Sequence, residues 1–268
     1  MDDRSNRLLP TAASAEIARR IKMHTPARLL VGRTGAAYRT ETQLQLREDH
    51  AKARDAVRAE LDLQTAFASE FIEKWNLFEV TTRAATKLEY LARPALGREF
   101  SDKSRTEILS RCLPGTDIQI VIGDGLSALA IQTQVPQLLP LLVDGARKSG
   151  WSIGQTFVVH HCRVGILNEI GELLKPQVVI VLIGERPGLA SAESMSAYMA
   201  YQPSRSHSDA NRNLISNIHD RGLSAPSAAA RILNLSAQMM RIGISGCTLK
   251  EQQPMLPNDI DRQWVGLF

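Results

Sequence analysis

A carboxylate and a guanidinium stand side by side where a long apolar run of the chain ends. Residues 178–183 read Val-Val-Ile-Val-Leu-Ile, and a glycine, Glu185 and Arg186 follow directly. An apolar run without alternation is typical of a strand buried on both faces of a parallel sheet. Because ligands bind beyond the carboxyl ends of such strands, Glu185 and Arg186 are candidate binding residues. The alternative is a polar turn or an Arg–Glu pair ahead of the next Pro-Gly.

A second candidate ligand site is the glycine-containing turn at residues 123–128. It reads Gly-Asp-Gly-Leu-Ser-Ala and fits the Gly-x-Gly-x-x-Ala pattern of a dinucleotide-binding turn. That pattern needs an acidic residue about twenty positions on, at the tip of the next strand. Asp144 has this spacing but lies in a helical pattern. The alternative is a tight turn in which Asp124 or Ser127 bonds the first amides of a helix. A stand-alone nucleotide-binding domain of an oxidoreductase or regulator is therefore an alternative function.

Histidine and cysteine side chains form no complete metal site in the sequence. His160, His161 and Cys162 are consecutive, but no further ligand has a suitable spacing, and we expect one histidine in the core and the next facing the crevice. The other cysteines, Cys112 and Cys247, are distant, which excludes a disulfide framework and favours a reducing cytosol. The chain also lacks a nucleophile elbow, a Walker loop and a His-Glu-x-x-His motif. No catalytic constellation stands alone in this sequence.

The composition is that of an ordinary globular protein. The 268 residues are 44% hydrophobic, with no apolar stretch long enough to cross a membrane and no secretory signal. Net charge is +4, and residues 1–54 hold 11 Lys/Arg against 6 Asp/Glu. The acids are interleaved and Tyr38 is the only Phe, Trp or Tyr of that segment, which argues against a nucleic-acid partner. A solvated basic face or a contact with an acidic partner subunit is favoured.

Two kinds of sequence pattern divide the chain at residue 114. Residues 1–114 predict a mainly helical N-terminal region that makes subunit contacts, and residues 115–268 predict a second domain of alternating strands and helices. The N-terminal pattern predicts helices at 12–23, 41–75 and 102–112 and irregular segments at 25–40 and 90–98. The second pattern predicts strands at 118–122, 156–160, 178–183 and 199–202 and helices at 125–133, 137–149, 165–174 and 226–242. Together they predict an α/β fold with a Rossmann-like parallel sheet covered on both faces.

A series of segments, in order along nearly the whole chain, resembles the small (light) subunit family of ethanolamine ammonia-lyase. Together these segments are highly specific, although none is so alone. They are Ala27–Gly35, Asp49–Asp55, Tyr90–Pro94 with Gly97 and Arg98, Ile122–Ser127, Gly184–Leu189 and Ile215–His219.

The resemblance implies half of an adenosylcobalamin-dependent enzyme that converts ethanolamine to acetaldehyde and ammonia by a radical mechanism. In that family the large subunit, a TIM-type barrel, holds the substrate, and the small subunit covers the cobalamin from the other side. It therefore implies a large-subunit partner, a higher oligomer of heterodimers, and no lyase activity for this chain alone. A scaffold that organises the large subunit without touching the cofactor is a further alternative.

The resemblance also bears on localisation. Family members commonly carry a longer leader, associated with packaging into bacterial microcompartments, whereas thirty residues precede Val31 here. We expect a cytoplasmic enzyme, either free or inside such a microcompartment.

Three positions that contact cobalamin in the family can be transferred by motif. Val164 matches the valine of Cys-Arg-Val-Gly after the second predicted strand, and Glu185 matches the glutamate of Gly-Glu-Arg-Pro-Gly. A carboxylate or backbone amide at Glu185 can bond the amide side chains of a corrin. Leu214 stands before Ile-Ser-Asn-Ile, where the family often has a cysteine. Leucine preserves a contact made through backbone or bulk, but not one made through sulfur.

Overall fold

The computed structural model describes residues 12–24, 33–188 and 192–251. The helices are α1 Ala12–His24, α2 Thr40–Arg58, α3 Leu63–Ala66, α4 Ser69–Trp75, α5 Lys87–Ala92, α6 Asp102–Arg111, α7 Ala128–Lys148, α8 Ile166–Leu174 and α9 Ala225–Ile242, with short 3₁₀ helices η1 Pro94–Arg98 and η2 Asp209–Asn211. The strands are β1 Arg33–Thr34, β2 Ala37–Tyr38, β3 Glu79–Thr81, β4 Ile118–Gly123, β5 Phe157–His160, β6 Val178–Gly184, β7 Met195–Tyr201 and β8 Asn213–Ile218.

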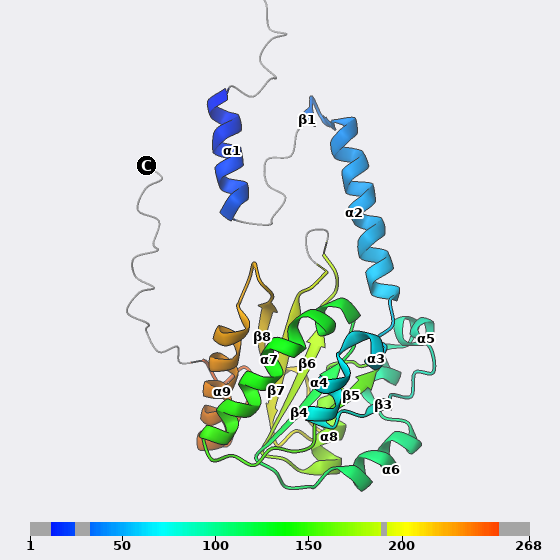
Figure 1. Cartoon of the computed structure of the whole chain (residues 1–268), viewed down its shortest axis with the longest axis vertical. Coiled ribbons are helices and arrows are strands. Elements are labelled where there is room, and N and C mark those ends of the chain that lie inside the picture. Colours follow the sequence, from blue (N-terminus) through cyan, green and yellow to red (C-terminus); the bar gives the residue numbers. More distant parts are fainter. Residues whose placement is uncertain (1–11, 25–32, 189–191, 252–268) are drawn as a thin grey trace, which may run out of the picture.

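The central sheet has the strand order β3-β5-β4-β6-β7-β8 (Figure 1). The first four strands are parallel, and β7 runs antiparallel to both of its neighbours. The predicted parallel sheet is therefore wrong at this end, because only the ten residues 185–194 join β6 to β7, fewer than the crossover to a parallel neighbour needs. The α/β class is confirmed, but with a mixed sheet in place of the Rossmann-like parallel one.

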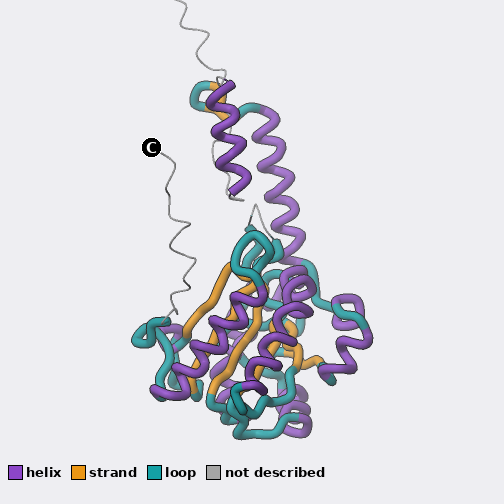
Figure 2. The backbone as a smooth tube through the Cα atoms, turned by 60° about the vertical axis from the view of Figure 1, so that its left-hand side comes forward, coloured by secondary structure: helices purple, strands orange, loops and turns teal. Residues whose placement is uncertain are grey.

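Helices cover the two faces of the sheet unequally (Figures 1 and 2). One apolar cluster joins α7 and α9, with α3 and its neighbours, to one face, and a second joins α6 and α8 to the other. On the first face α9 packs against β7 and β8, whereas on the second α8 packs against β6. The second face of β7 and β8 is consequently open where Leu214 lies, since 45% of that residue is exposed.

The apolar runs predicted the central strands β4, β5 and β6 to within one residue at each end, and these three strands are confirmed. The predicted strand at 199–202 is the end of β7, which begins at Met195. β3 and β8 were not predicted. β3 is only three residues long, and Asn213–Ile218 mixes polar residues with apolar ones in no strict alternation. Because β3 pairs with β5, the sheet includes a strand that precedes residue 114.

The two helices predicted at 125–133 and 137–149 are one helix, α7, which contains Pro136 and Pro140. A proline removes one helical hydrogen bond and crowds the preceding turn, so a break was expected there. Buried apolar residues continue at helical spacing on both sides of Pro136, including Ile131, Leu138 and Leu142. Packing of this stripe against the sheet keeps the helix continuous.

The N-terminal helices differ in how they contact the rest of the molecule. The helix predicted at 41–75 is divided into α2, α3 and α4, and the Asp62 side chain caps α3 by accepting from the amides of Gln64 and Thr65. α2 buries no residue and projects away from the sheet in both views (Figures 1 and 2). In the segment predicted as irregular, 25–40, residues 25–32 lie outside the described residues, and the remainder contains the short hairpin of β1 and β2. Among the described helices, none has the length and apolar content that crossing a bilayer requires.

Candidate functional site

A cleft of about 330 Å³ lies where β4, β5 and β6 end and extends over the open face of β7 and β8. We call it the strand-end cleft. All three residues transferred by motif line it. Val164 follows β5, Glu185 follows β6, and Leu214 lies on β8 opposite Tyr198 of β7. Residues separated by up to fifty positions are therefore brought to one cavity.

The Glu185 carboxylate is held by donors from β7, β8 and the connection before β7. Its Oε1 accepts from the Ser196 hydroxyl at 2.5 Å and from the Asn217 amide at 3.0 Å. Its Oε2 accepts from the Ser194 hydroxyl at 2.7 Å. Burial acts to raise the pKa of this carboxyl, but the three donors outweigh it and the pKa lies below its ordinary value. Glu185 is therefore an ionised group that fixes the end of β6 to its neighbours.

Arg186 is exposed and lines the same cleft. No ion pair joins it to Glu185 in the part of the chain that the structure describes, because the carboxylate takes its bonds from the serines and an amide instead. The alternative of an Arg–Glu pair is therefore wrong. The exposed guanidinium remains able to donate to a ligand in the cleft.

The loop that carries Val164 is fixed by Asp124. The Asp124 side chain accepts from the amide of His161 at 2.9 Å and from the amide of Cys162 at 2.8 Å. Lys87 Nζ lies 3.7 Å from the same carboxylate, and only 8% and 2% of the two side chains are exposed. A buried pair with its remaining donors and acceptors satisfied holds its surroundings in one arrangement. The turn after β4 thus positions the turn after β5.

Tyr90 braces this loop from the other side. Its hydroxyl donates to the Cys162 carbonyl at 3.0 Å, and the Arg163 guanidinium lies 4.1 Å from the centre of its ring. Arg163 also donates to the Tyr90 carbonyl at 3.1 Å. Sequence reasoning did not assign a role to Tyr90 or Lys87. Tyr90 begins one of the segments that carry the resemblance, whereas nothing in the sequence signals Lys87.

The Gly-x-Gly-x-x-Ala turn is packed against the rest of the site. A Cβ on Gly125 would meet the Gly184 carbonyl at 2.4 Å, so the backbone of the β6 turn already fills the space above it. Ser127 caps α7 by accepting from the Ala130 amide at 3.2 Å, as the tight-turn alternative predicted, whereas Asp124 bonds the next loop. A dinucleotide needs open amides and close backbone approach at this point. The turn offers neither, which disfavours a nucleotide-binding function.

His160 and His161 each form a hydrogen bond with another part of the fold. His160 pairs with Glu79 at 2.8 Å, and His161 Nδ1 bonds the Ala84 carbonyl at 2.8 Å. Neither lines the strand-end cleft, so the expectation that one faces it is wrong. Over the described residues, no group of three His, Cys, Asp or Glu is arranged to hold a metal ion.

The strand-end cleft is equipped to bind rather than to react. Burial raises the pKa of the Cys162 thiol well above its ordinary value, so it is a poor nucleophile at neutral pH. Burial and then the Glu185 charge raise the pKa of Tyr198, which stays a neutral phenol that can donate and accept. Beside these groups stand the apolar side chains of Val164 and Leu214. Such a surface can hold a ligand through both apolar contacts and hydrogen bonds.

Comparisons with known proteins all point to one protein family. The sequence profile of the ethanolamine ammonia-lyase light chain matches residues 15–250. An ethanolamine ammonia-lyase small subunit from Clostridioides difficile is 42% identical over 250 residues, which are 93% of this chain and 83% of that protein. The small subunit from Listeria monocytogenes is 39% identical with the same coverage. That from Fusobacterium nucleatum is 38% identical over 242 residues, 90% of this chain and 80% of the relative.

The matched range contains every strand of the central sheet and every residue of the strand-end cleft. On this match and on the relatives' identities, the chain belongs to the ethanolamine ammonia-lyase light chain family.

Proposed function

We propose that this chain is the small subunit of an adenosylcobalamin-dependent ethanolamine ammonia-lyase. In this proposal the strand-end cleft covers the cobalamin at the interface with the large subunit, which holds ethanolamine. The family membership supports the enzyme, and the convergence of Val164, Glu185 and Leu214 supports the place of the cofactor. That convergence is the observation on which the proposal depends, because the three residues come from three separate elements.

The size and lining of the cleft fit part of a corrin. Its volume of about 330 Å³ is at the low end of the roughly 300–1,000 Å³ typical of sites for drug-sized ligands. A corrinoid is larger than such a ligand, so the cleft forms one wall of a site that a second subunit completes. Hydroxyls of Tyr198 and Ser216 and the Arg186 guanidinium can pair with amide side chains around the ring.

The residues of this chain bind and shield in the proposed site. Adenosylcobalamin, when bound, supplies the radical chemistry that removes a substrate hydrogen, and the protein supplies orientation and protection. Val164 and Leu214 exclude water from one side of the ring. Glu185 fixes the backbone of the β6 turn and has acceptor capacity left on Oε2, which receives one donor, from Ser194.

The large subunit needs a contact surface beyond the cleft. α2 projects from the sheet without burying any of its residues, and Leu44 on it is exposed. We propose that this helix, in the basic N-terminal region, contacts the large subunit in a higher oligomer of heterodimers. The assembled enzyme would reside in the cytoplasm, free or in a bacterial microcompartment.

Reconstitution tests this function. The isolated chain with adenosylcobalamin and ethanolamine should release no ammonia, and addition of the large subunit should start turnover. Ammonia release by the chain alone, or a large subunit whose activity the chain does not change, would contradict it. Activity restored without any effect of the chain on cobalamin retention would favour the scaffold alternative. Binding of a nicotinamide or flavin nucleotide by the isolated chain would favour the nucleotide-binding one.

A further inference from the structure

A second cleft, of about 700 Å³, lies beside the first and is lined by arginines. Its walls come from the β3–η1 region, α6, the start of α8 and the segment before β8. We call it the arginine cleft, after Arg83, Arg98, Arg105, Arg205 and Arg212. Three carboxylates share this lining, so the positive charges are in excess by two. No feature of the proposed corrin contact explains that excess.

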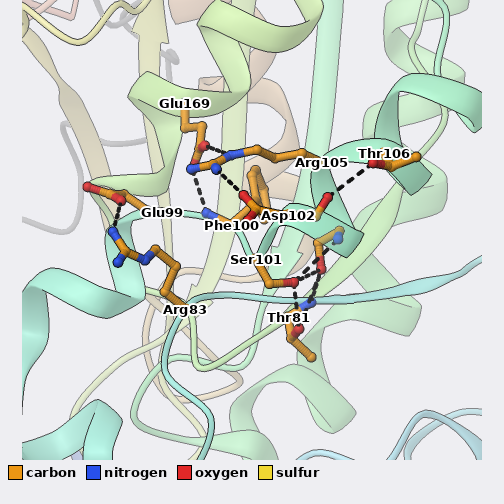
Figure 3. A network of polar contacts seen from close by, with 10 residues as sticks. Thr81, Arg83, Glu99, Phe100, Ser101, Asp102, Arg105, Thr106 and Glu169 are labelled. Carbon is orange, nitrogen blue, oxygen red and sulfur yellow. Dashed lines mark hydrogen bonds and ion pairs between the residues drawn. The ribbon is translucent and has the colours of Figure 1, made fainter.

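Two of the arginines are neutralised within the wall (Figure 3). Arg83 pairs with Glu99 at 2.7 Å. Arg105 pairs with Glu169 at 2.6 Å, and the other oxygen of Glu169 accepts from the amide of Phe100. Both carboxylates are thus occupied by their own partners. They are not available to balance the remaining cations.

Arg212 is the buried cation of this cleft. Only 6% of its side chain is exposed, it pairs with Asp209, and it donates to the Asn168 side chain at 3.3 Å. Its Nε has no hydrogen-bond partner among the described residues, and neither does the buried Nδ1 of His207. Burial lowers the pKa of the Arg212 guanidinium; the Asp209 charge acts against this, and the nearby Arg98 charge lowers the pKa further. Asp209 supplies a counter-charge, but the buried Nε–H of Arg212 still lacks an acceptor in the described part of the chain, and such a donor is costly unless a further acceptor completes its environment.

Arg98 supplies a second charge close to Arg212. A Cβ on Gly165 would meet Arg98 Cγ at 2.8 Å, so the stem of Arg98 lies directly across the start of α8. No side chain caps this helix, whose N-terminus adds positive potential. Neither Arg98 nor Arg205 has an acidic side chain paired with its guanidinium over the described residues. Arg212 keeps one donor without a partner among these residues although it pairs with Asp209, so its guanidinium and that of Arg98 can together donate to an oxyanion.

We propose that the arginine cleft binds a phosphate-like oxyanion between Arg98 and Arg212. The planar guanidinium forks match the several oxygens of a phosphate group better than a single-atom anion. The cleft is also adjacent to the strand-end cleft, because Val164 lines one and Gly165 the other, and Leu214 and Arg212 are two residues apart. A phosphate could therefore arrive as the nucleotide phosphodiester of the corrinoid, which rests on the proposed function, or as a free phosphate compound.

Inorganic phosphate tests the site in the full chain, without the large subunit. Sodium phosphate, against sodium chloride at equal ionic strength, should raise the unfolding temperature of the wild type. Arg98→Gln, an exposed position, should require about tenfold more phosphate for the same shift, as expected for losing one charge-assisted bond. Gly165→Ala, which keeps every charge but displaces Arg98, should weaken binding similarly. Arg241→Gln, an equal charge change at an exposed position on α9, should behave as wild type.

Corrinoids distinguish the two sources in the assembled enzyme. If the nucleotide phosphodiester occupies the cleft, Arg98→Gln weakens retention of adenosylcobalamin but not of adenosylcobinamide, which lacks that phosphate. If a free phosphate compound occupies it, Arg98→Gln affects the retention of both corrinoids equally, while phosphate still binds the isolated wild-type chain. Absence of a phosphate shift in the wild type, or an equal shift in Arg98→Gln, overturns the proposal. Loss of subunit assembly in Arg98→Gln without phosphate binding would instead assign the cleft to an acidic partner surface. Failure of any corrinoid to bind would count against the proposed function and leave the phosphate result intact.

Discussion

The amide of Cys162 donates to Asp124 Oδ1 at 2.8 Å, which ties the turn after β5 to the turn after β4. Behind the carboxylate lies Lys87, which also donates to the Gly125 carbonyl at 3.2 Å. The loop that presents Val164 to the strand-end cleft is therefore held by the buried Lys87–Asp124 ion pair, which bonds the turns after both β4 and β5. Without this ion pair, we expect the loop that carries Val164 to lose its position in the cleft wall.

Replacement of Asp124 by alanine should destabilise the fold strongly. It leaves the Lys87 ammonium buried without a counter-charge and removes the acceptor of two amides. Loss of one partner of a buried pair costs roughly 3–5 kcal/mol. Urea denaturation followed by circular dichroism measures the free energy of unfolding.

The control is the double variant Lys87→Met with Asp124→Ala, which should recover part of the loss because no unpaired charge remains. An Asp124→Ala variant within about 0.5 kcal/mol of wild type, the range of ordinary surface substitutions, would show that the pair is not structural.

Glu185 predicts an acid-dependent contribution to stability. Its pKa in the folded protein is below the ordinary value of 4.5, so the folded state favours the ionised form. The contribution is present above that ordinary value and is lost as the pH falls through the folded pKa. Glu185→Gln should therefore lose less unfolding free energy than wild type when the pH falls from neutral to well below 4.5, with the exposed Glu60→Gln as control. Equal acid sensitivity of Glu185→Gln and wild type would exclude this role.

Alanine substitutions at two glycines with positive φ can distinguish the cost of a left-handed backbone from the cost of a steric clash. Gly125 has φ +58° and a blocked Cβ position, whereas Gly150 has φ +76° and nothing within 4 Å. Alanine at Gly150 should cost about 1–2 kcal/mol for the left-handed conformation alone. Alanine at Gly125 should cost roughly 1–3 kcal/mol more, because it also pushes against the Gly184 carbonyl. Thermal unfolding of both variants compares them, and equal losses would mean that the turn has room to adjust.

The sequence predicted those parts of the fold that depend on local pattern. β4 and β6 are continuous apolar runs, and their burial on both faces follows directly from that composition. The direction of β7 could not be predicted in this way, because an apolar run has the same composition whichever way the strand runs. β8 was missed because Asn213–Ile218 mixes polar and apolar residues in no strict alternation, and because the apolar Leu214 lies on the exposed side of the strand.

The residues of the candidate site were predicted through resemblance, and only some of those that line or support the cleft were named. Motifs supplied Val164, Glu185 and Leu214, which the fold does bring together. The support beneath them could not be read from the chain, because Asp124 bonds amides almost forty positions away and Lys87 has no motif of its own. The arginine cleft could not be predicted from the sequence for the same reason. Its cations are scattered between Arg83 and Arg212 and become a cluster only when the loops fold together.

The central claim is that the strand-end cleft contacts cobalamin in the assembled enzyme. Leu214→Glu tests it most directly, because the residue is exposed in the isolated chain and its replacement should leave the fold intact. Leu113→Glu, at another exposed leucine preceding β4, is the matched control. Equilibrium dialysis of adenosylcobalamin against the complex with the large subunit measures the affinity. We predict at least about a tenfold loss for Leu214→Glu, since a carboxylate would be buried against the corrin, and no loss for Leu113→Glu. Unchanged cobalamin affinity in Leu214→Glu would contradict the account.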